Sequence, residues 1–510
     1  MGSFRAFASL CCSLALLQPG GQAQQAGTVS PEESPAISLQ HCSKERGCEQ
    51  EQAALVLDAN WRWVHNVGGD TNCYDNGRWN EAFCPDTETC KRNCAMEGVS
   101  AENYKTSYGV ETVPDGVELK FLSPGGNVGS RLYVTDGHDA YKMFKLLNRE
   151  FTLDVDVSTL ACGLNGAVYF VEMDEMGGKG KAAGNAAGAN KQATAFTPHP
   201  CSTTGPVRCT GIDCGIGDGE LDRYKGLCDK DGCDSNAYRL GAKSYYGDGP
   251  QFQVDSSKPM TVVTQFLTSN GADDGDLVEI RRLYLQDGKL IANAVVNSSA
   301  IPSMSELGGE DSITDAQDSI TDGLCDAQKR AFGNVNSHQA KGGLRSMGEA
   351  LRRGMVSSLS LWDDSATQMR WLDSNYPVGA DPGRPEWHAG PATDSPAART
   401  TSGSTTPTPT SGTRALSTAR SEPPSQSPQA VAKHTCVAAS IPKSDQLVAK
   451  HTFVATSIPK SDSRVVKHMV PVRGDTFGRA IESANTDLDQ LDGPEDMQFF
   501  QFVTYTVSLV

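Results

Sequence analysis

The chain is poor in positive charge and in long apolar runs. Its 510 residues carry 45 Lys and Arg against 62 Asp and Glu, which gives a formal net charge of −17 at pH 7. Phosphate backbones and anionic lipids repel negative proteins, so we expect neither nucleic acid nor a membrane as a partner. After the N-terminal segment, no run reaches the roughly 18 apolar residues of a membrane-spanning helix. Histidine is also scarce, with nine residues, which disfavours a zinc protein.

Cysteine, in contrast, is abundant. The chain has 16 cysteines, too many for a typical cytosolic enzyme, and they indicate a compartment in which disulfides form. Arg5 precedes an apolar run over residues 6–17, Pro19 and Gly20 interrupt it, and Ala23 ends a small-residue cleavage site. We therefore predict a signal peptide over residues 1–23 and a secreted, extracellular protein. The alternative interpretation of this run is a buried helix.

Helical periodicity is scarce between residues 41 and 380. Short runs rich in β-branched and aromatic residues, such as 131–134, 167–171 and 260–266, alternate with Gly, Asn and Asp clusters. Many short strands separated by turns predict an all-β sandwich or barrel. Residues 382–429 are rich in Ser, Thr and Pro, and such a segment cannot bury a core. We predict a disordered linker there.

Residues 430–510 form a tail with an internal repeat. Val431–Thr435 recurs 17 residues later as Val448–Thr452, and each copy is followed by Ser-Ile-Pro-Lys-Ser-Asp. Metal binding by the repeated histidine is one interpretation, but no cysteine or carboxylate recurs with it. Tandem duplication in a tolerant tail is the favoured one.

Eight short strings, taken together, identify a family. They lie at residues 58–63, 72–74, 84–86, 162–167, 197–201, 231–234, 360–364 and 371–374. In this order they resemble glycoside hydrolase family 7, the cellobiohydrolases and endo-β-1,4-glucanases that degrade cellulose. The resemblance runs from residue 41 to about 381 and implies a family domain over residues 24–381. It also implies a jelly-roll β-sandwich of the concanavalin A type with a long substrate cleft.

Tryptophans in polar surroundings indicate a sugar site. Pyranose rings present flat C–H faces, on which indole rings stack. The candidates from the sequence are Trp61, Trp63, Trp362 and Trp371. Core packing is the alternative role, and it applies most to Trp61. The resemblance favours the cleft and implies further lining positions at Arg131, Asn165, Tyr169, His199, Arg223, Asp231, Arg239 and Tyr376. The loop around Arg223 resembles the cellobiohydrolase branch.

The resemblance also implies a disulfide framework. The expected pairs are Cys42–Cys48, Cys73–Cys94, Cys84–Cys90, Cys201–Cys228, Cys209–Cys214 and Cys233–Cys325. Cys162 and Cys436 have no assigned partner. Zinc binding is the rival interpretation of the cysteines, but their spacing is irregular, so we expect neither a metal nor a cofactor.

The sequence lacks the catalytic string of the family. A retaining glycosidase needs two carboxyl groups roughly 5–5.5 Å apart, and the resemblance implies that they come from a Glu-x-Asp-x-x-Glu string. No such string occurs; the family pattern breaks between Ala189 and Asn190. The nearest acidic group, Glu172-Met173-Asp174-Glu175, has the wrong spacing. We therefore assign no catalytic residue.

Family membership implies hydrolysis of β-1,4-glucosidic bonds in cellulose with retention of configuration. We expect this chain to be inactive, because its catalytic carboxylates are absent. The alternative is a non-catalytic cellulose- or β-glucan-binding protein, and a lectin-like domain is a weaker third. We expect a monomer, with Asn297 in the only Asn-x-Ser/Thr sequon as a glycosylation site.

The missing segment also affects the expected stability. In the family, the catalytic carboxylates project from a strand on the cleft floor. A strand lost from within a sheet leaves unpaired backbone groups on the neighbouring edges, at about 1–3 kcal/mol for each buried group. We therefore expect the chain as written to fold and to be secreted poorly.

Overall fold

The computed structural model describes about half of the chain. The described residues are 25–44, 46–75, 78–114, 116–160, 164–179, 222–226, 229, 232–297, 317–363, 429–437, 454–455 and 505–509. The predicted signal peptide lies outside them, as does the predicted linker apart from Gln429. Within the described part, no helix is long and apolar enough to cross a membrane.

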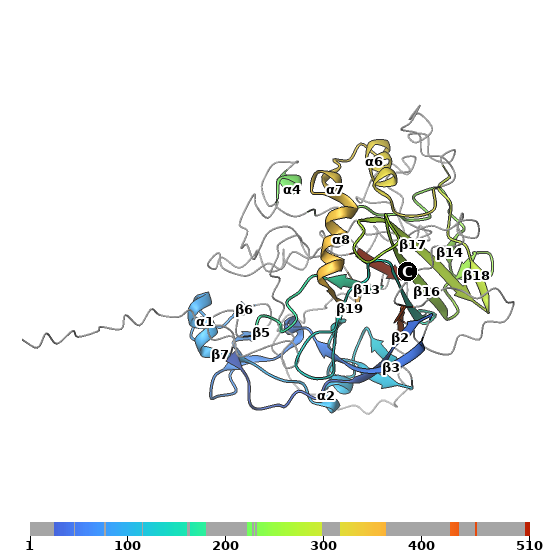
Figure 1. The fold of residues 1–510 in the computed structure, drawn as a ribbon. Coiled ribbons are helices and arrows are strands. Elements are labelled where there is room, and N and C mark those ends of the chain that lie inside the picture. Colours follow the sequence, from blue (N-terminus) through green and yellow to red (C-terminus); the bar gives the residue numbers. More distant parts are fainter. Residues whose placement is uncertain are drawn as a thin grey trace, which may run out of the picture.

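Most of the described strands belong to one 15-stranded sheet that folds back on itself (Figure 1). Its path runs through β18 (Lys289–Ile291), β17 (Leu277–Gln286), β16 (Met260–Thr268), β12 (Arg149–Asp156), β20 (Gln429–Val437), β2 (Ala36–Ser43), β3 (Gly47–Leu57), β10 (Ser130–Thr135), β19 (Met355–Trp362), β13 (Asn165–Val171) and β22 (Tyr505–Leu509). Off this path lie β8 (Val110–Val113), β9 (Gly116–Lys120), β11 (Met143–Phe144) and β21 (Val454–Ala455). The predicted all-β class is confirmed.

The core lies between the two halves of this sheet. Residues alternate between faces along a strand, so every second residue of β13 faces the other half. Phe170 of β13 packs edge-on against Phe151 of β12, with ring centroids 4.8 Å apart, and against Phe266 of β16 at 6.4 Å. Strands that lie far apart along the sheet path thus meet across the core. This arrangement is the sandwich that the family resemblance implies.

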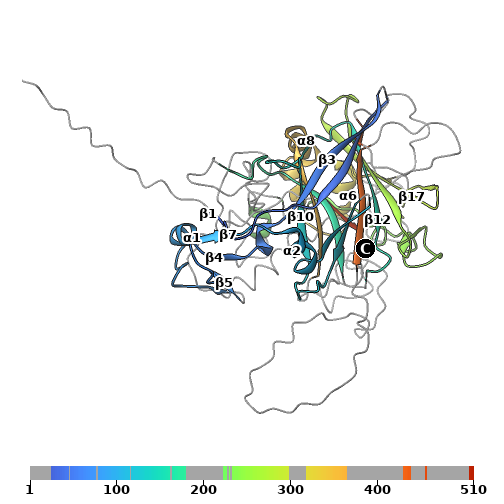
Figure 2. The ribbon, with the colours of Figure 1, turned by 90° about the horizontal axis from the view of Figure 1, so that it is seen from below.

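A smaller unit lies at one end of the sandwich, around α1 (Thr87–Asn93) (Figure 2). Its three-stranded sheet consists of β1 (Gln25–Ala26), β7 (Cys94–Met96) and β4 (Val64–Asn66), and its hairpin of β5 (Tyr74–Asp75) and β6 (Arg78–Trp79). Two further short strands, β14 (Tyr246–Gly247) and β15 (Val254–Asp255), pair with each other beside β17, away from this unit (Figure 1).

Helices are short and few in the described residues. They are the 3-10 helix η1 (Ala59–Trp61), α2 (Ala101–Thr106), α4 (Asp222–Lys225), α6 (Asp322–Ala331), α7 (Ser337–Ala340) and α8 (Gly343–Arg353). Helices α6, α7 and α8 lie together beside β17 (Figure 1). Leu344, Met347 and Leu351 of α8 are buried in the main core, so this helix anchors the group to the sandwich.

Four of the expected disulfides are present in the described residues. They are Cys42–Cys48, Cys73–Cys94, Cys84–Cys90 and Cys233–Cys325. The first closes the hairpin of β2 and β3, where the two cysteines stand opposite each other. The pairs Cys201–Cys228 and Cys209–Cys214, and the unassigned Cys162, lie outside the described part of the chain.

The repeated tail contributes strands to the sheet, which the sequence pattern did not indicate. Leu39 and Gln40 of β2 pair with Thr435 and Cys436 of the first copy. The next two residues of β2, His41 and Cys42, pair with Val454 and Ala455. In the first copy of the repeat, the residues that correspond to Val454 and Ala455 are Val437 and Ala438. These two residues directly follow Cys436. The second copy therefore continues the strand of the first in the same register.

This shared register predicts that one repeat unit is dispensable. Deleting residues 437–453 joins Cys436 to Val454 and makes the strand continuous. Because shortening a loop changes closure entropy only slowly with length, we expect a thermal midpoint within about 4 °C of the parent chain. Differential scanning calorimetry measures this.

Deletion of residues 429–455 is the control. It removes the whole strand between β12 and β2, and we expect the cooperative transition to be lost. Equal damage from both deletions would show that the two copies are not interchangeable in the sheet.

Candidate functional site

A polar face lies on the side of the sheet that points away from the main core, where several of its residues belong to a second buried cluster. It spans the adjacent strands β3, β10, β19 and β13. The register aligns Tyr133, Ser358 and Tyr169 in one row across three of these strands. The next row aligns Arg131, Ser360 and Ala167. Their strand neighbours, such as Leu132, Leu359 and Val168, are buried in the main core.

An ion pair is at the centre of this face. Arg131 Nε lies 2.9 Å from Asp58 Oδ2, and the Tyr133 hydroxyl donates to the same oxygen. Burial is the largest single effect and opposes the charged form of Arg131, but Asp58, Tyr133 and Tyr169 together raise the pKa of the guanidinium well above its usual range. Burial and then Asp58 raise the pKa of Tyr133 well above its ordinary value. Asp58 thus fixes a permanent cation and a neutral hydroxyl next to each other on this largely buried face of the sheet.

Tyr169 and Asn165 lie on the same face of β13. Burial has the largest effect on the pKa of Tyr169 and raises it, while Arg131 and hydrogen bonds with Ser358 and Ser360 oppose that shift. Asn165 stands opposite Trp362. Its amide nitrogen and oxygen are both buried and have no hydrogen-bond partner among the described residues. Buried polar atoms of this kind usually have a partner, so the fully buried Asn165 amide has unused hydrogen-bonding capacity.

The tryptophans on η1 and next to β4 have different surroundings. Trp61 is half-buried against the main core, and the Arg131 guanidinium lies 5.3 Å from its ring centroid. Trp63 is 36% exposed and stacks on His65, with ring centroids 4.2 Å apart. Its indole Nε1 donates to Asn72 Oδ1 at 2.8 Å. Asn72 lines a hollow of about 510 Å³ together with Asp70, Thr71, Asp75, Arg78, Trp79 and Asn80.

The structure describes only some of the other expected residues. Arg239 forms a buried ion pair with Asp234, with Nη2 and Oδ1 2.6 Å apart, and lies over the Phe332 ring. Arg223 lies on α4, but its side chain is outside the described part, as are His199, Asp231, Trp371 and Tyr376. The polar face therefore brings together Arg131, Asn165, Tyr169 and Trp362, with Trp61 beside Arg131.

The acidic group after β13 is structural. Both carboxylate oxygens of Glu172 bind Arg353, at 2.5 Å to Nε and 3.1 Å to Nη2. Asp174 accepts backbone hydrogen bonds from Met176 and Gly178. Two other carboxyl groups, Glu150 and Asp318, have a pKa raised to about 7, mainly by burial. Glu150 lies on β12 and Asp318 precedes the bridge to β17, so neither is on the polar face.

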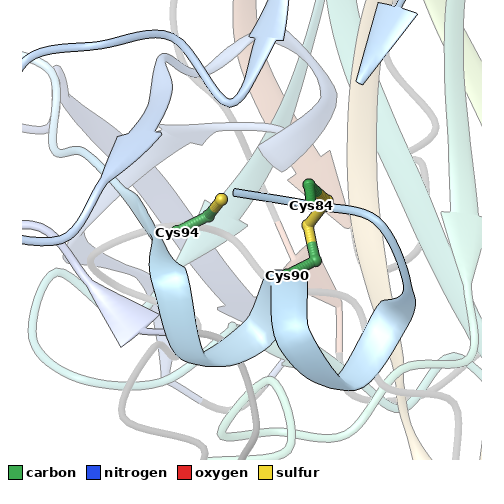
Figure 3. Close-up of side chains that lie close together, drawn as sticks. All are labelled: Cys84, Cys90 and Cys94. Carbon is green, nitrogen blue, oxygen red and sulfur yellow. A yellow bond between two sulfur atoms is a disulfide. The ribbon is translucent and has the colours of Figure 1, made fainter. Parts of the chain in front are cut away.

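Two clusters in the described residues have the composition of a metal site. The sulfurs of Cys84, Cys90 and Cys94 lie close together around α1 (Figure 3). All three belong to disulfides, so none offers a thiolate. In the second cluster, of Asp322, Cys325 and His338, the cysteine is also oxidised. Burial opposes protonation of His338, but Asp229 and Asp322 raise its pKa and favour an ion pair over a metal ligand.

Four important residues of the face were not among the sequence candidates: Asp58, Tyr133, Ser358 and Ser360. Asp58 lies within the family string at residues 58–63, and Ser358 and Ser360 alternate with leucines along β19. This period-two pattern is the signal that could have identified the two serines. No comparable signal links Asp58 to Tyr133, because their contact joins segments 75 residues apart.

Comparison with known proteins is consistent with the β-sandwich described above. The glycosyl hydrolase family 7 model matches residues 26–191 and 188–410. The chain therefore belongs to glycosyl hydrolase family 7. The two matched parts meet at residues 188–191, where the sequence pattern breaks. Family membership supports glucan hydrolysis as the activity of the family and a glucan as its ligand.

Solved structures of the same family are similar to this chain. A cellobiohydrolase from Daphnia pulex is 39% identical, with a TM-score of 0.66 over 72% of this chain and 93% of that one. An endoglucanase I in complex with cellobiose is 30% identical, with a TM-score of 0.58 over 69% and 90%. A cellobiohydrolase from Melanocarpus albomyces in complex with cellotetraose is 28% identical, with a TM-score of 0.64 over 81% and 98%.

The ion pair between Asp58 and Arg131 predicts that substitution of Asp58 strongly lowers the stability of the protein. Asp58→Asn leaves the buried Arg131 without its counter-ion, and we expect unfolding to become easier by about 3–5 kcal/mol. Urea denaturation measures the change. Asp273→Asn is the matched control. It makes the same chemical change in the exposed ion pair between Asp273 and Arg149. Such pairs contribute little, so the control should stay near the parent. Equal losses of stability in the two variants would show that the ion pair between Asp58 and Arg131 contributes no more than an exposed one.

Proposed function

We propose that this chain keeps the glucan specificity of its family but does not hydrolyse the β-1,4-glucosidic bond. The observation that carries the proposal is the absence of a Glu-x-Asp-x-x-Glu string anywhere in the 510 residues. The family match divides into two parts at residues 188–191, which supports a lost segment at that point. Cellulose or another β-1,4-glucan is the proposed ligand.

The chemistry of the polar face suits binding better than cleavage. Retaining hydrolysis requires one carboxylate as a nucleophile and a second carboxyl group as a proton donor. Arg131, Tyr133, Tyr169 and the two serines of β19 supply hydrogen bonds only. Asp58 is the carboxylate on this face, and Arg131 and Tyr133 occupy it. A charged nucleophile held in an ion pair is not free to attack a sugar carbon.

Binding is favoured by the exposed indole of Trp63 and the unused amide of Asn165. The indole offers an apolar ring face to a pyranose, and its hydrogen bond to Asn72 fixes the ring orientation. The Asn165 amide can exchange hydrogen bonds with sugar hydroxyl groups. These contacts support the non-catalytic alternative, in which the chain acts as a glucan-binding protein.

We also infer secretion, a monomeric state and glycosylation at Asn297. The disulfides of the described residues are typical of oxidising compartments, which supports the signal peptide. Asn297 is exposed at the end of a described segment, so the sequon is accessible to the modifying enzyme.

The proposal predicts binding without turnover. The full chain, expressed in a eukaryotic secretory host, should co-sediment with crystalline cellulose and release no phenol from an aryl β-cellobioside. Trp63→Ala should weaken the binding several-fold, because it removes a stacking surface.

Val67→Ala is the matched control. Val67 is also exposed, at 52%, and directly follows β4, but it offers no ring face, so binding should be unchanged. Release of phenol above the level of a mock purification would contradict the inactivity. Absence of cellulose binding would contradict the glucan-binding role.

A further inference from the structure

The last strand of the chain pairs with β13. β13 has β19 on one edge and β22, at residues Tyr505–Leu509, on the other. The pairing with β22 is antiparallel and extends over five residue pairs, from Gly166 with Leu509 to Phe170 with Tyr505. Residues more than 300 positions apart in the sequence thus complete one part of the sheet (Figure 1).

This edge of β13 needs a partner. All seven residues of β13 are buried, so an unpaired edge would leave N–H and C=O groups away from water. The family pattern breaks at residues 189–190, soon after β13 ends. Strands that follow each other in a sequence are usually neighbours in the sheet. A strand lost at the break would therefore have left an edge of β13 open.

The register of β22 suits this position. Opposite Gly166, Val168 and Phe170 stand Leu509, Val507 and Tyr505. These β13 positions alternate with those of the polar face, and Val168 and Phe170 belong to the main core. Opposite Ala167 and Tyr169, on the polar face, stand the hydroxyl residues Ser508 and Thr506. Apolar residues thus stand opposite the positions of the main core and hydroxyl residues opposite the positions of the polar face, a pattern that a one-residue slip would reverse.

We propose that β22 is a replacement strand, which closes the edge of β13 left open by the lost segment. The replacement carries no Asp or Glu, so it restores the backbone pairing of the sheet without restoring carboxylates next to Tyr169. It also counters the expectation that the truncated sheet folds poorly. This inference concerns the sheet itself and stands independently of the proposed glucan binding.

The register gives a direct test by cross-linking. Ala167 and Ser508 stand opposite each other, and opposite Cα atoms in an antiparallel pair lie about 4.5–5.5 Å apart, within the range of a disulfide. We introduce Ala167→Cys and Ser508→Cys together in the full chain, with Cys162→Ser and Cys436→Ser to remove the unassigned thiols. Non-reducing peptide mapping by mass spectrometry should find residues 167 and 508 linked within a monomer.

Ala167→Cys with Thr506→Cys is the control, because it places the second thiol two residues out of register. We expect at least tenfold less cross-linking in this variant. An equal yield, no linkage, or a linkage only between two chains would overturn the proposal.

A second pair of variants keeps the test decisive if the cysteine variants are not secreted. Val507→Pro removes a backbone donor and blocks β22, whereas Val507→Ile keeps an apolar β-branched residue at the same position. The proposal predicts that the proline variant aggregates or loses its cooperative melting transition, while the isoleucine variant remains monodisperse. Indistinguishable behaviour of the two variants would overturn it.

Discussion

A strand that is buried on both faces must have hydrogen-bonding partners on both edges, and β13 is the strand on which this fold depends. Its Val168 and Phe170 belong to the main core, and its Ala167, Tyr169 and Val171 to a second buried cluster on the opposite face. Water reaches neither side, so each backbone group must be satisfied within the protein. The central position of β13 follows from this requirement: β19 satisfies one edge and the C-terminal strand the other.

The same alternation that fixes β13 also produces the candidate site. Along β10, Leu132 and Val134 pack in the main core, and Arg131 and Tyr133, which alternate with them, carry the charge and the hydroxyl of the polar face. Asp58 directly follows β3, at the level where it can hold both Arg131 and Tyr133. The face is thus arranged by buried electrostatics before any ligand is present.

Much of this architecture could be predicted from the sequence, because local patterns determine it. The short alternating runs around Tyr133 and Tyr169 indicate strands, and the family strings imply pairs such as Cys42–Cys48 and Cys233–Cys325, which the structure contains. The role of the tail was not predictable in this way. A Ser-, Thr- and Pro-rich segment followed by a repeat indicates no long-range pairing, and nothing local in Tyr505–Leu509 identifies β13 as its partner. The Asp58 contacts were missed for the same reason, since they join distant strands.

We propose that this family 7 fold persists without a catalytic nucleophile. Retaining glycosidases pass through a covalent glycosyl-enzyme intermediate, which activated 2-deoxy-2-fluoro cellobiosides trap. Intact-mass spectrometry after incubation with such a reagent is the most direct test, with the Daphnia pulex cellobiohydrolase as a positive control. We expect an unchanged mass for this chain and a single added disaccharide for the control. A stoichiometric adduct on any carboxylate of this chain would contradict the proposal.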